Sequence, residues 1–436
     1  MKKLSLVLSF TFMASMIFAQ NAAVVNQTKD KNKANVTQAG SKNGAQVDQV
    51  GTSNFVTVDS KGKQNEVTVV QNGSGNGAVS DPIWGFVKQA GDANIANLKE
   101  GVVGGQVSND NDGFIDQKGN NNQATLEIMG SNNNFVDHGI TQIQKSTLGT
   151  EGNTAIIKQS SFNSDMNVYQ EGTKNRVEGN TVGNNDVFSV DQGGIANTAS
   201  INQIGNNNNE FGSGFNINTK ETTWNQVTQS GSYNAAVVSQ GSDNIFRIKQ
   251  YGDENKAMIN QEGNNVVNTL QQGNLNTIGG LSNFVPQEVA TFSTGATMDA
   301  VQLGDNNKLY VSTAGRLNVF QNNSSIASEG NTVKYTQTSA GDADLNQVGS
   351  NNLVFLKTTT AGLIDVDQNG TSNGVALYAN GSASAASGSA LFEGTHLNVD
   401  QTGSSNLLNL NSTGANASVD VMQNGSSNWA SVVQSN

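Results

Sequence analysis

The sequence predicts an all-β protein, a β-solenoid of stacked strand-turn-strand coils with about 22 residues per coil, two parallel sheets and about 15 coils. Three observations predict this fold. The phrase Gln-x-Gly-x-x-Asn recurs along the chain, often at intervals of eleven or 22 residues, and a period of this kind is typical of stacked repeats. Between the phrases, inward and outward residues alternate with a period of two, as in strands. The two prolines, Pro82 and Pro286, lie where the repeat is interrupted, which suits long hydrogen-bonded ladders.

Each eleven-residue arc is predicted to be one strand followed by one tight turn. In residues 43–49, Asn43, Ala45, Val47 and Gln49 alternate with a second set that carries the charged residue Asp48. Period-two alternation places the first set on one face of the strand and the second set on the other. The inward order is therefore amide, aliphatic, aliphatic, amide, and two arcs make one coil.

One coil cannot fold alone. It buries about four aliphatic side chains, worth roughly 1.5–3 kcal/mol each for the larger ones, and ordering its backbone costs about 1–2 kcal/mol per residue. Stacking at about 4.8 Å changes this balance, because it pairs every strand with its copies and lets buried amides hydrogen-bond along the axis. We therefore expect structural ladders of stacked amides. The ladder residues are Asn32, Gln38, Asn43, Gln49, Asn54, Asn65, Gln71, Asn153, Gln159, Gln170, Gln192, Asn197, Gln203, Asn234, Gln240, Asn244, Gln250, Asn255, Gln261, Gln347, Gln368, Gln401, Gln423, Asn428 and Gln434.

The turns are predicted at the glycine two residues after each glutamine, because glycine adopts positive φ without steric cost. These turn glycines are Gly40, Gly51, Gly73, Gly194, Gly205, Gly252, Gly403 and Gly425. Some arcs keep the inward face but lose the glutamine, with Ser60, Ile128 and Ser412 in its place.

The chain divides into a signal peptide, residues 1–19, and a repeat domain with loop insertions, residues 20–436. Lys2 and Lys3 precede an apolar run that ends at Ala19, which is the pattern of a secretory signal and is short for a membrane span. The mature chain is therefore expected to be soluble or extracellular. Segments longer than the repeat are expected to be loops: 77–88, 99–116, 134–149, 209–222, 277–300, 308–314, 353–362 and 374–394.

Composition argues against several functions. The formal net charge of −12 becomes about −14 without Lys2 and Lys3, which disfavours nucleic acid as the main partner. The chain has no cysteine, and its two histidines, His138 and His396, have no ligand-spaced partners. No metal cluster, nucleophile elbow or phosphate loop is found. We expect no catalytic residue, no cofactor, no metal site and no enzymatic activity.

Both ends of the predicted solenoid lack an obvious cap. Asn21, Ala23, Val25 and Gln27 already fit the inward pattern, and 428–434 is a complete arc. Unpaired strand edges recruit other chains, so we expect head-to-tail polymerisation into a cross-β fibre.

The arc resembles the curlin repeat of curli, the functional amyloid fibres of bacterial surfaces. Gln38, Gly40, Asn43, Ala45 and Gln49 match that repeat in order and spacing. The resemblance implies export through an outer-membrane channel, polymerisation at the cell surface on a nucleator subunit, and a role in biofilm matrix and adhesion. The chain is longer than five-repeat curlins, has no separate targeting segment before the first repeat and carries insertions. Major subunit, minor subunit and nucleator therefore stay open as roles.

Two other classes are possible. A monomeric surface adhesin or ice-binding solenoid would share the fold, although ice binding favours a regular threonine row and threonine is scattered here. A solenoid enzyme acting on carbohydrate needs clustered acidic or basic residues on one face, which the sequence does not contain.

Overall fold

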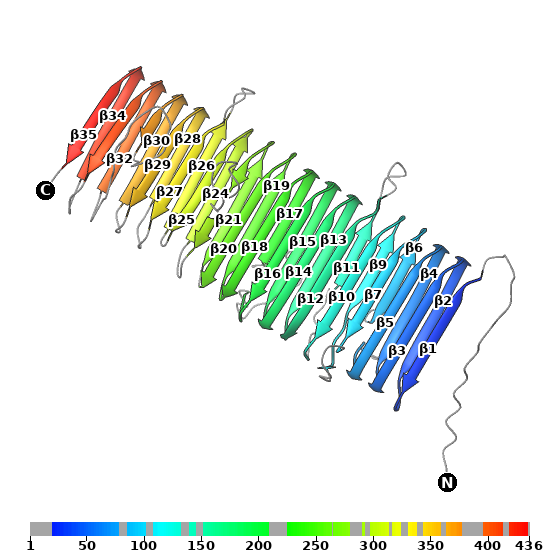
Figure 1. The fold of residues 1–436 in the computed structure, drawn as a ribbon. Helices are drawn as coiled ribbons and strands as arrows, with labels where there is room; N and C mark the ends of the chain where they lie inside the picture. The colour runs from blue at the N-terminus through cyan, green and yellow to red at the C-terminus, as the bar shows by residue number, and fades with distance from the viewer. Residues whose placement is uncertain are drawn as a thin grey trace, which may run out of the picture.

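The computed structural model describes residues 20–77, 85–101, 108–131, 139–144, 151–208, 225–263, 265–279, 290–292, 297–313, 316–323, 330–337, 343–358, 363–376, 396–412 and 418–434. These residues form strands and turns and contain no helix. The strands lie side by side in chain order along one long axis, from β1 at one end to β35 at the other (Figure 1). The predicted all-β solenoid is confirmed.

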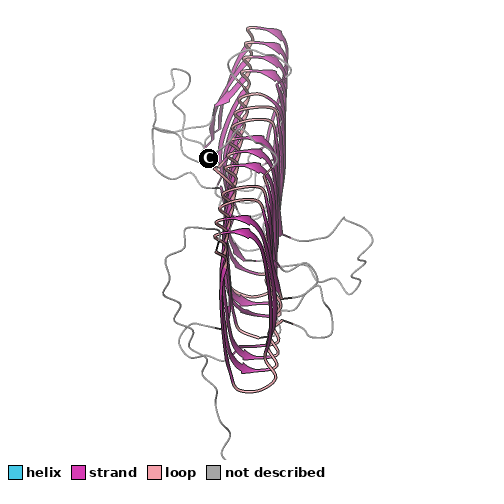
Figure 2. Ribbon diagram, turned by 90° about the vertical axis from the view of Figure 1, so that its right-hand side faces the viewer, coloured by secondary structure: helices cyan, strands magenta, loops and turns pink. Residues whose placement is uncertain are grey.

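The strands form two sheets, which we call sheet A and sheet B, and Figure 2 shows them as two facing rows joined by turns. Sheet A contains 19 strands and sheet B contains 16. In sheet A, β7 with β8 and β22 with β23 share one rung each, because both members of a pair lie beside the same strand. The described strands therefore fill seventeen rungs of sheet A and sixteen of sheet B, close to the predicted fifteen coils.

Sheet A consists of β1 (Ala22–Thr28), β3 (Gly44–Thr52), β5 (Glu66–Ser74), β7 (Ile95–Glu100), β8 (Ser108–Asn109), β10 (Gln123–Met129), β12 (Thr154–Phe162), β14 (Arg176–Asn184), β16 (Thr198–Ile204), β18 (Ala235–Ser242), β20 (Lys256–Gly263), β22 (Thr277–Ile278), β23 (Ala290–Phe292), β25 (Lys308–Thr313), β27 (Thr332–Gln337), β29 (Leu353–Thr358), β31 (Gly374–Ala376), β33 (Leu407–Ser412) and β35 (Trp429–Gln434).

Sheet B consists of β2 (Lys33–Ser41), β4 (Phe55–Lys63), β6 (Phe86–Ala90), β9 (Phe114–Lys118), β11 (Gly139–Ile143), β13 (Asp165–Thr173), β15 (Val187–Ile195), β17 (Asn225–Ser232), β19 (Ile245–Tyr251), β21 (Val266–Gln272), β24 (Thr297–Gly304), β26 (Arg316–Asn323), β28 (Ala343–Ser350), β30 (Leu363–Thr371), β32 (His396–Ser404) and β34 (Ser418–Ser426).

Neighbouring strands of each sheet pair in parallel and in register. Between β3 and β5, for example, Ala45 lies beside Val67 and Gln49 lies beside Gln71. The register follows from the period-two pattern, because a shift of one residue would turn the apolar set to solvent. Equivalent side chains of successive coils are therefore direct neighbours along the axis.

The apolar core is one continuous column between the two sheets. Its members alternate along each strand and are almost completely inaccessible to solvent, as with Val47, Val69 and Leu98. Phe188, one of the two largest fully buried side chains, fits because Gly179 lies opposite. A Cβ atom on Gly179 would approach the Phe188 ring to 2.4 Å, so the glycine makes room for it.

Seven of the eight segments expected to be loops contain described strand residues. Segments 77–88 and 99–116 reach into β6 and β9, 277–300 contains β22 and β23, and 374–394 begins with β31. Three others each contain one whole strand. Residues 308–313 form β25, residues 353–358 form β29, and residues 139–143 form β11. These segments lack the complete phrase but keep its inward apolar positions, and Leu309, Val354 and Ile140 are buried. An aliphatic face is therefore enough to hold an arc once its neighbours supply the hydrogen bonds. The predicted signal peptide, His138, Pro82, Pro286 and most of the predicted insertions lie outside the described residues.

The two edges of the solenoid differ. The chain passes from sheet B to sheet A mostly through short turns. For example, β15 ends at Ile195 and β16 begins at Thr198. The longer connections mostly lead from sheet A to sheet B, for example from β16 to β17 across residues 205–224. The edge of short turns is the one along which the amide ladders described next run without interruption.

Candidate functional site: the buried amide ladders

A row of buried glutamines runs along sheet B. Fourteen successive rungs carry glutamine at the same position, and each Nε2 donates to the Oε1 of the next rung at 2.7–2.9 Å. The row contains Gln89, Gln117, Gln142, Gln170, Gln192, Gln229, Gln250, Gln271, Gln302, Gln321, Gln347, Gln368, Gln401 and Gln423. Every bond has the same direction, so the row has a donor end and an acceptor end.

The second proton of each Nε2 joins the two sheets. Gln117 donates to the Ile95 carbonyl at 3.0 Å, and Gln250 donates to the Ala235 carbonyl at 3.1 Å. A buried amide without partners would cost free energy. Here the stacking that orders the glutamine side chain also provides hydrogen-bond partners for its amide.

A second row, of asparagines, runs the whole length of sheet A just before each strand. The backbone N–H of each asparagine donates to the Oδ1 of the asparagine one coil earlier at 3.0–3.2 Å. The row contains Asn21, Asn43, Asn65, Asn94, Asn122, Asn153, Asn175, Asn197, Asn234, Asn255, Asn276, Asn307, Asn331, Asn352, Asn373, Asn406 and Asn428. The side-chain Nδ2 of Asn43 also donates to the Gly62 carbonyl of the following turn at 3.0 Å.

The remaining amides expected in ladders lie in two less regular rows. In sheet A, Gln49 donates to Gln71 and Gln203 donates to Gln240, which in turn donates to Gln261, but Gln159 lies between Ile128 and Thr181. In sheet B, Asn32, Asn54 and Asn244 precede their strands, and the backbone N–H of Asn54 donates to the Asn32 Oδ1 at 3.1 Å. At the ends of the chain, Gln38 lies beside Ser60, and Gln434 pairs through its backbone with Ser412.

Several members of the two long rows were not among the expected ladder residues. Gln142 and Gln321 have no glycine two residues later, so the phrase does not mark them. Their only signal is a position two residues after a buried aliphatic side chain, Ile140 and Val319. Asn94, Asn122 and Asn276 do complete the phrase, and the repeat spacing alone could have identified them.

The expected turn glycines adopt φ values that side chains rarely allow, for example +125° at Gly51 and +115° at Gly403. Gly40, Gly51, Gly194, Gly252 and Gly403 also lie against a glycine in the turn of the next coil. A Cβ atom on Gly403 would lie 1.9 Å from the Gly425 carbonyl oxygen, so the turns stack backbone on backbone.

Gly403→Ala is expected to lower the free energy of unfolding by on the order of 2 kcal/mol or more, because it combines a positive φ with a backbone clash. Gly44→Ala is the matched control, since a Cβ atom there meets nothing within 4 Å. Denaturant unfolding measures both variants. Equal stability of the two would show that the turns do not require close stacking.

The family comparison agrees with this geometry. Residues 40–73, which run from the last residues of β2 to the last residues of β5, match the family model of the curlin associated repeat. This segment is similar to the curlin repeat. The suspected resemblance is confirmed here, and the arcs that follow extend the same register along both sheets. Among curated proteins, none matches the chain.

Two buried carboxylates take amide positions in the two less regular rows. Glu100 takes the glutamine position after Gln71, whose Nε2 donates to its Oε2 at 2.8 Å. Burial, followed by repulsion from Asp112, raises the pKa of Glu100 to about 8. Asp186 takes an asparagine position in sheet B and accepts from Asn208, and burial raises its pKa to about 6. One oxygen of each carboxylate has no partner among the described residues, which favours the protonated acid in the folded state.

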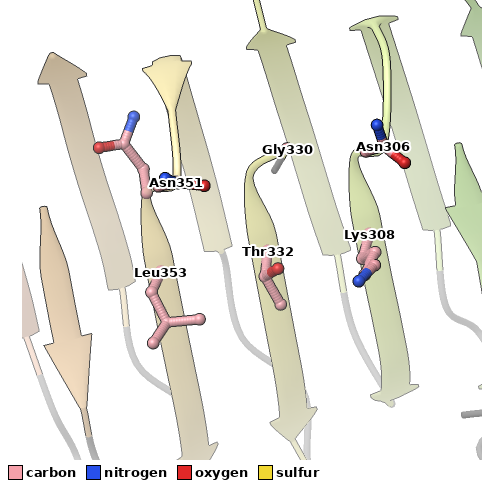
Figure 3. Close-up of a pocket in the computed structure, with 7 residues that line it drawn as sticks. Asn306, Lys308, Gly330, Thr332, Asn351 and Leu353 are labelled. Atoms are coloured by element: carbon pink, nitrogen blue, oxygen red, sulfur yellow. The ribbon is translucent and has the colours of Figure 1, made fainter. Parts of the chain in front are cut away.

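A shallow groove of about 310 Å³ crosses the outside of three successive rungs, β25, β27 and β29. Figure 3 shows Lys308, Thr332 and Leu353 side by side from these strands, with Asn306 and Asn351 at the turns above them. The groove brings together one amine, one hydroxyl and amides from neighbouring coils. Within the described residues, no group of three or more histidine or acidic side chains could hold a metal ion. Likewise, no helix there is long and apolar enough to cross a membrane.

Proposed function

We propose that this chain is a secreted structural subunit that polymerises head to tail into extracellular curli-like fibres for biofilm matrix and surface adhesion. The observation that carries the proposal is that the end rungs carry amides at the positions of both long rows, with complementary groups. Hydrogen-bond donors at one end of the molecule therefore match acceptors at the other end.

Because the hydrogen bonds of each row run in one direction, each row presents a donor at one end of the molecule and an acceptor at the other. At the C-terminal rung, Gln423 donates one Nε2 proton to the Leu407 carbonyl and keeps a second for a further coil, and the Oδ1 of Asn428 can accept. At the N-terminal rung of sheet B, Gln38 occupies the glutamine position, one rung before Ser60, whose hydroxyl donates to the Gln89 Oε1 at 2.9 Å. The asparagine row begins at Asn21. A second copy in the same orientation would extend both rows, whereas a reversed copy would set donor against donor.

The core column is open at both ends. In the described part of the chain, β1 and β2 pair on one side only, as do β34 and β35. At the N-terminal end Val25, which faces inward by pattern, is 43% exposed. Burial of apolar side chains at about 25 cal/mol per Å² adds to the pairing of strand edges, which recruit other chains.

Other features support the same function. The curlin repeat at residues 40–73 suggests self-assembly. The acidic chain has no evident nucleic-acid partner, and we propose a structural rather than an enzymatic role. By the curlin resemblance, further partners would be a nucleator subunit and an outer-membrane export channel. The signal peptide at residues 1–19 would direct the chain to export.

Incubation of the purified mature chain is expected to give unbranched fibres that bind an amyloid dye, with a lag phase that preformed fibre fragments remove. Dye fluorescence and negative-stain microscopy measure this directly. A monodisperse monomer after days at high concentration would contradict the fibre proposal and favour a monomeric adhesin.

A further inference from the structure

We propose that each junction in the fibre is a strand exchange, in which β35 of one copy takes the place of β1 on β3 of the next copy. The inference rests on the proposed head-to-tail polymer and specifies its partner surface. It follows from the number of rungs in the two sheets and from the likeness of the two terminal strands.

The rung counts are unequal. The described strands fill seventeen rungs of sheet A and sixteen of sheet B, and both β1 and β35 belong to sheet A. Copies related by one translation along the axis need equal counts in both sheets. If β1 simply stacked on β35, β34 and the next copy's β2 would lie two rungs apart, at about 9.6 Å, with an empty rung between them.

The two terminal strands present the same inward residues. In β1 and its preceding residue these are Asn21, Ala23, Val25 and Gln27, and in β35 they are asparagine, alanine, valine and glutamine at 428, 430, 432 and 434. Within one copy, β1 places Ala23 beside Ala45 and Val25 beside Val47. A neighbour's β35 can make the same pairs, and Asn428 can replace Asn21 as acceptor for the backbone N–H of Asn43.

We expect β1, rather than β35, to be displaced from its sheet. All seven of its residues are exposed. In β35, by contrast, Ala430 and Val432 pack against the core. The exchange forms two strand pairs, β35 with β3 and β34 with β2, and breaks one, whereas simple stacking forms one pair and leaves a gap. It also brings Gln423 beside Gln38, which is followed by Ser60 and then by the glutamine row of the next copy.

The outer face of β3 has room for the incoming strand. In the exchanged register Trp429 lies beside Gly44, where a Cβ atom would meet nothing within 4 Å. Trp429 is 66% exposed in the single copy. An aromatic side chain beside a glycine on a neighbouring strand covers the exposed backbone, and the residue it replaces there is Ala22.

Because the chain contains no cysteine, introduced cysteine pairs can report the junction. Directly opposed residues on adjacent rungs are about 4.8 Å apart, within the range that a disulfide spans. The exchange predicts intermolecular disulfides in fibres of Ser41→Cys/Ser426→Cys and of Gln46→Cys/Ser431→Cys. Simple stacking predicts a disulfide in Val24→Cys/Ser431→Cys instead. Ser404→Cys/Ser426→Cys is the intramolecular positive control, since these hydroxyls lie 3.1 Å apart.

Fibres are first verified by dye binding and microscopy, oxidised, and analysed on non-reducing gels. Covalent multimers from the first two pairs, with none from the third, support the exchange. Multimers from the third pair alone would overturn it while the fibre function stands, as would fibres in which no junction pair reacts. Absence of fibres from the cysteine-free chain would instead overturn the proposed function.

Discussion

Replacing three glutamines of the sheet B row, Gln117→Ala, Gln250→Ala and Gln368→Ala, is expected to abolish fibre elongation on the timescale of the unmodified chain. Each change removes two axial hydrogen bonds, one from the previous rung and one to the next. An unpaired buried amide costs about 1–3 kcal/mol, and the cavity adds to this, so each site loses on the order of 2–4 kcal/mol. The sites lie several coils apart, so their effects should add. Seeded dye fluorescence measures the elongation rate.

The matched control replaces three exposed glutamines of strands β3, β10 and β21, Gln46→Ala, Gln123→Ala and Gln272→Ala. This variant has the same change in composition without the loss of a buried ladder. We expect elongation within about twofold of the unmodified chain, since exposed substitutions usually change stability by no more than about 0.5 kcal/mol. If both triple variants were equally slow, glutamine content rather than the ladder would limit assembly.

The second large effect concerns Glu100→Gln, which restores an amide to the row beside Gln71. Burial holds the pKa of Glu100 at about 8 in the folded chain, against about 4.3 for an unperturbed glutamate. Between these values the folded state binds a proton that the unfolded state does not, so the unmodified chain loses stability as pH rises, by up to about 1.4 kcal/mol per pH unit. The variant lacks this group and should be more stable at pH 8 by on the order of 3 kcal/mol.

Denaturant midpoints of the monomer at pH 5, 6.5 and 8 separate the two carboxylates. Asp186, with its pKa raised to about 6, makes the free energy of unfolding depend on pH mainly below that value. Above pH 6 the Glu100→Gln variant should therefore be nearly independent of pH, while the unmodified chain declines. Parallel pH profiles for the two proteins would show that Glu100 does not take up the proton.

The fold could be predicted because the same residue types recur at a regular spacing. The alternation around Ala45 and Val47 fixes which face is buried, and the glycines at positions such as Gly51 fix where the chain turns. Two sheets and in-register parallel pairing then follow, because other arrangements leave the buried amides without partners.

The details that sequence did not predict depend on context. Residues 308–313 and 353–358 form strands although they lack the phrase, because neighbouring coils supply a template for an aliphatic face. Glu100 could not be assigned to the glutamine position of sheet A beside Gln71, since its arc lacks the glycine that marks the turn. One edge of the solenoid has mostly short turns and the other has the longer connections, and the two sheets have unequal numbers of rungs. Both features appear only when each arc is assigned to its sheet.

The most direct test is a high-resolution electron cryomicroscopy map of fibres grown from the mature chain. It should show rungs spaced by about 4.8 Å, sixteen rungs per copy and hence an axial repeat of about 77 Å, with the glutamine row continuous from Gln423 of one copy to Gln38 of the next. A map in which the rungs of adjacent copies are offset, so that these two glutamines do not superpose along the axis, would contradict the account.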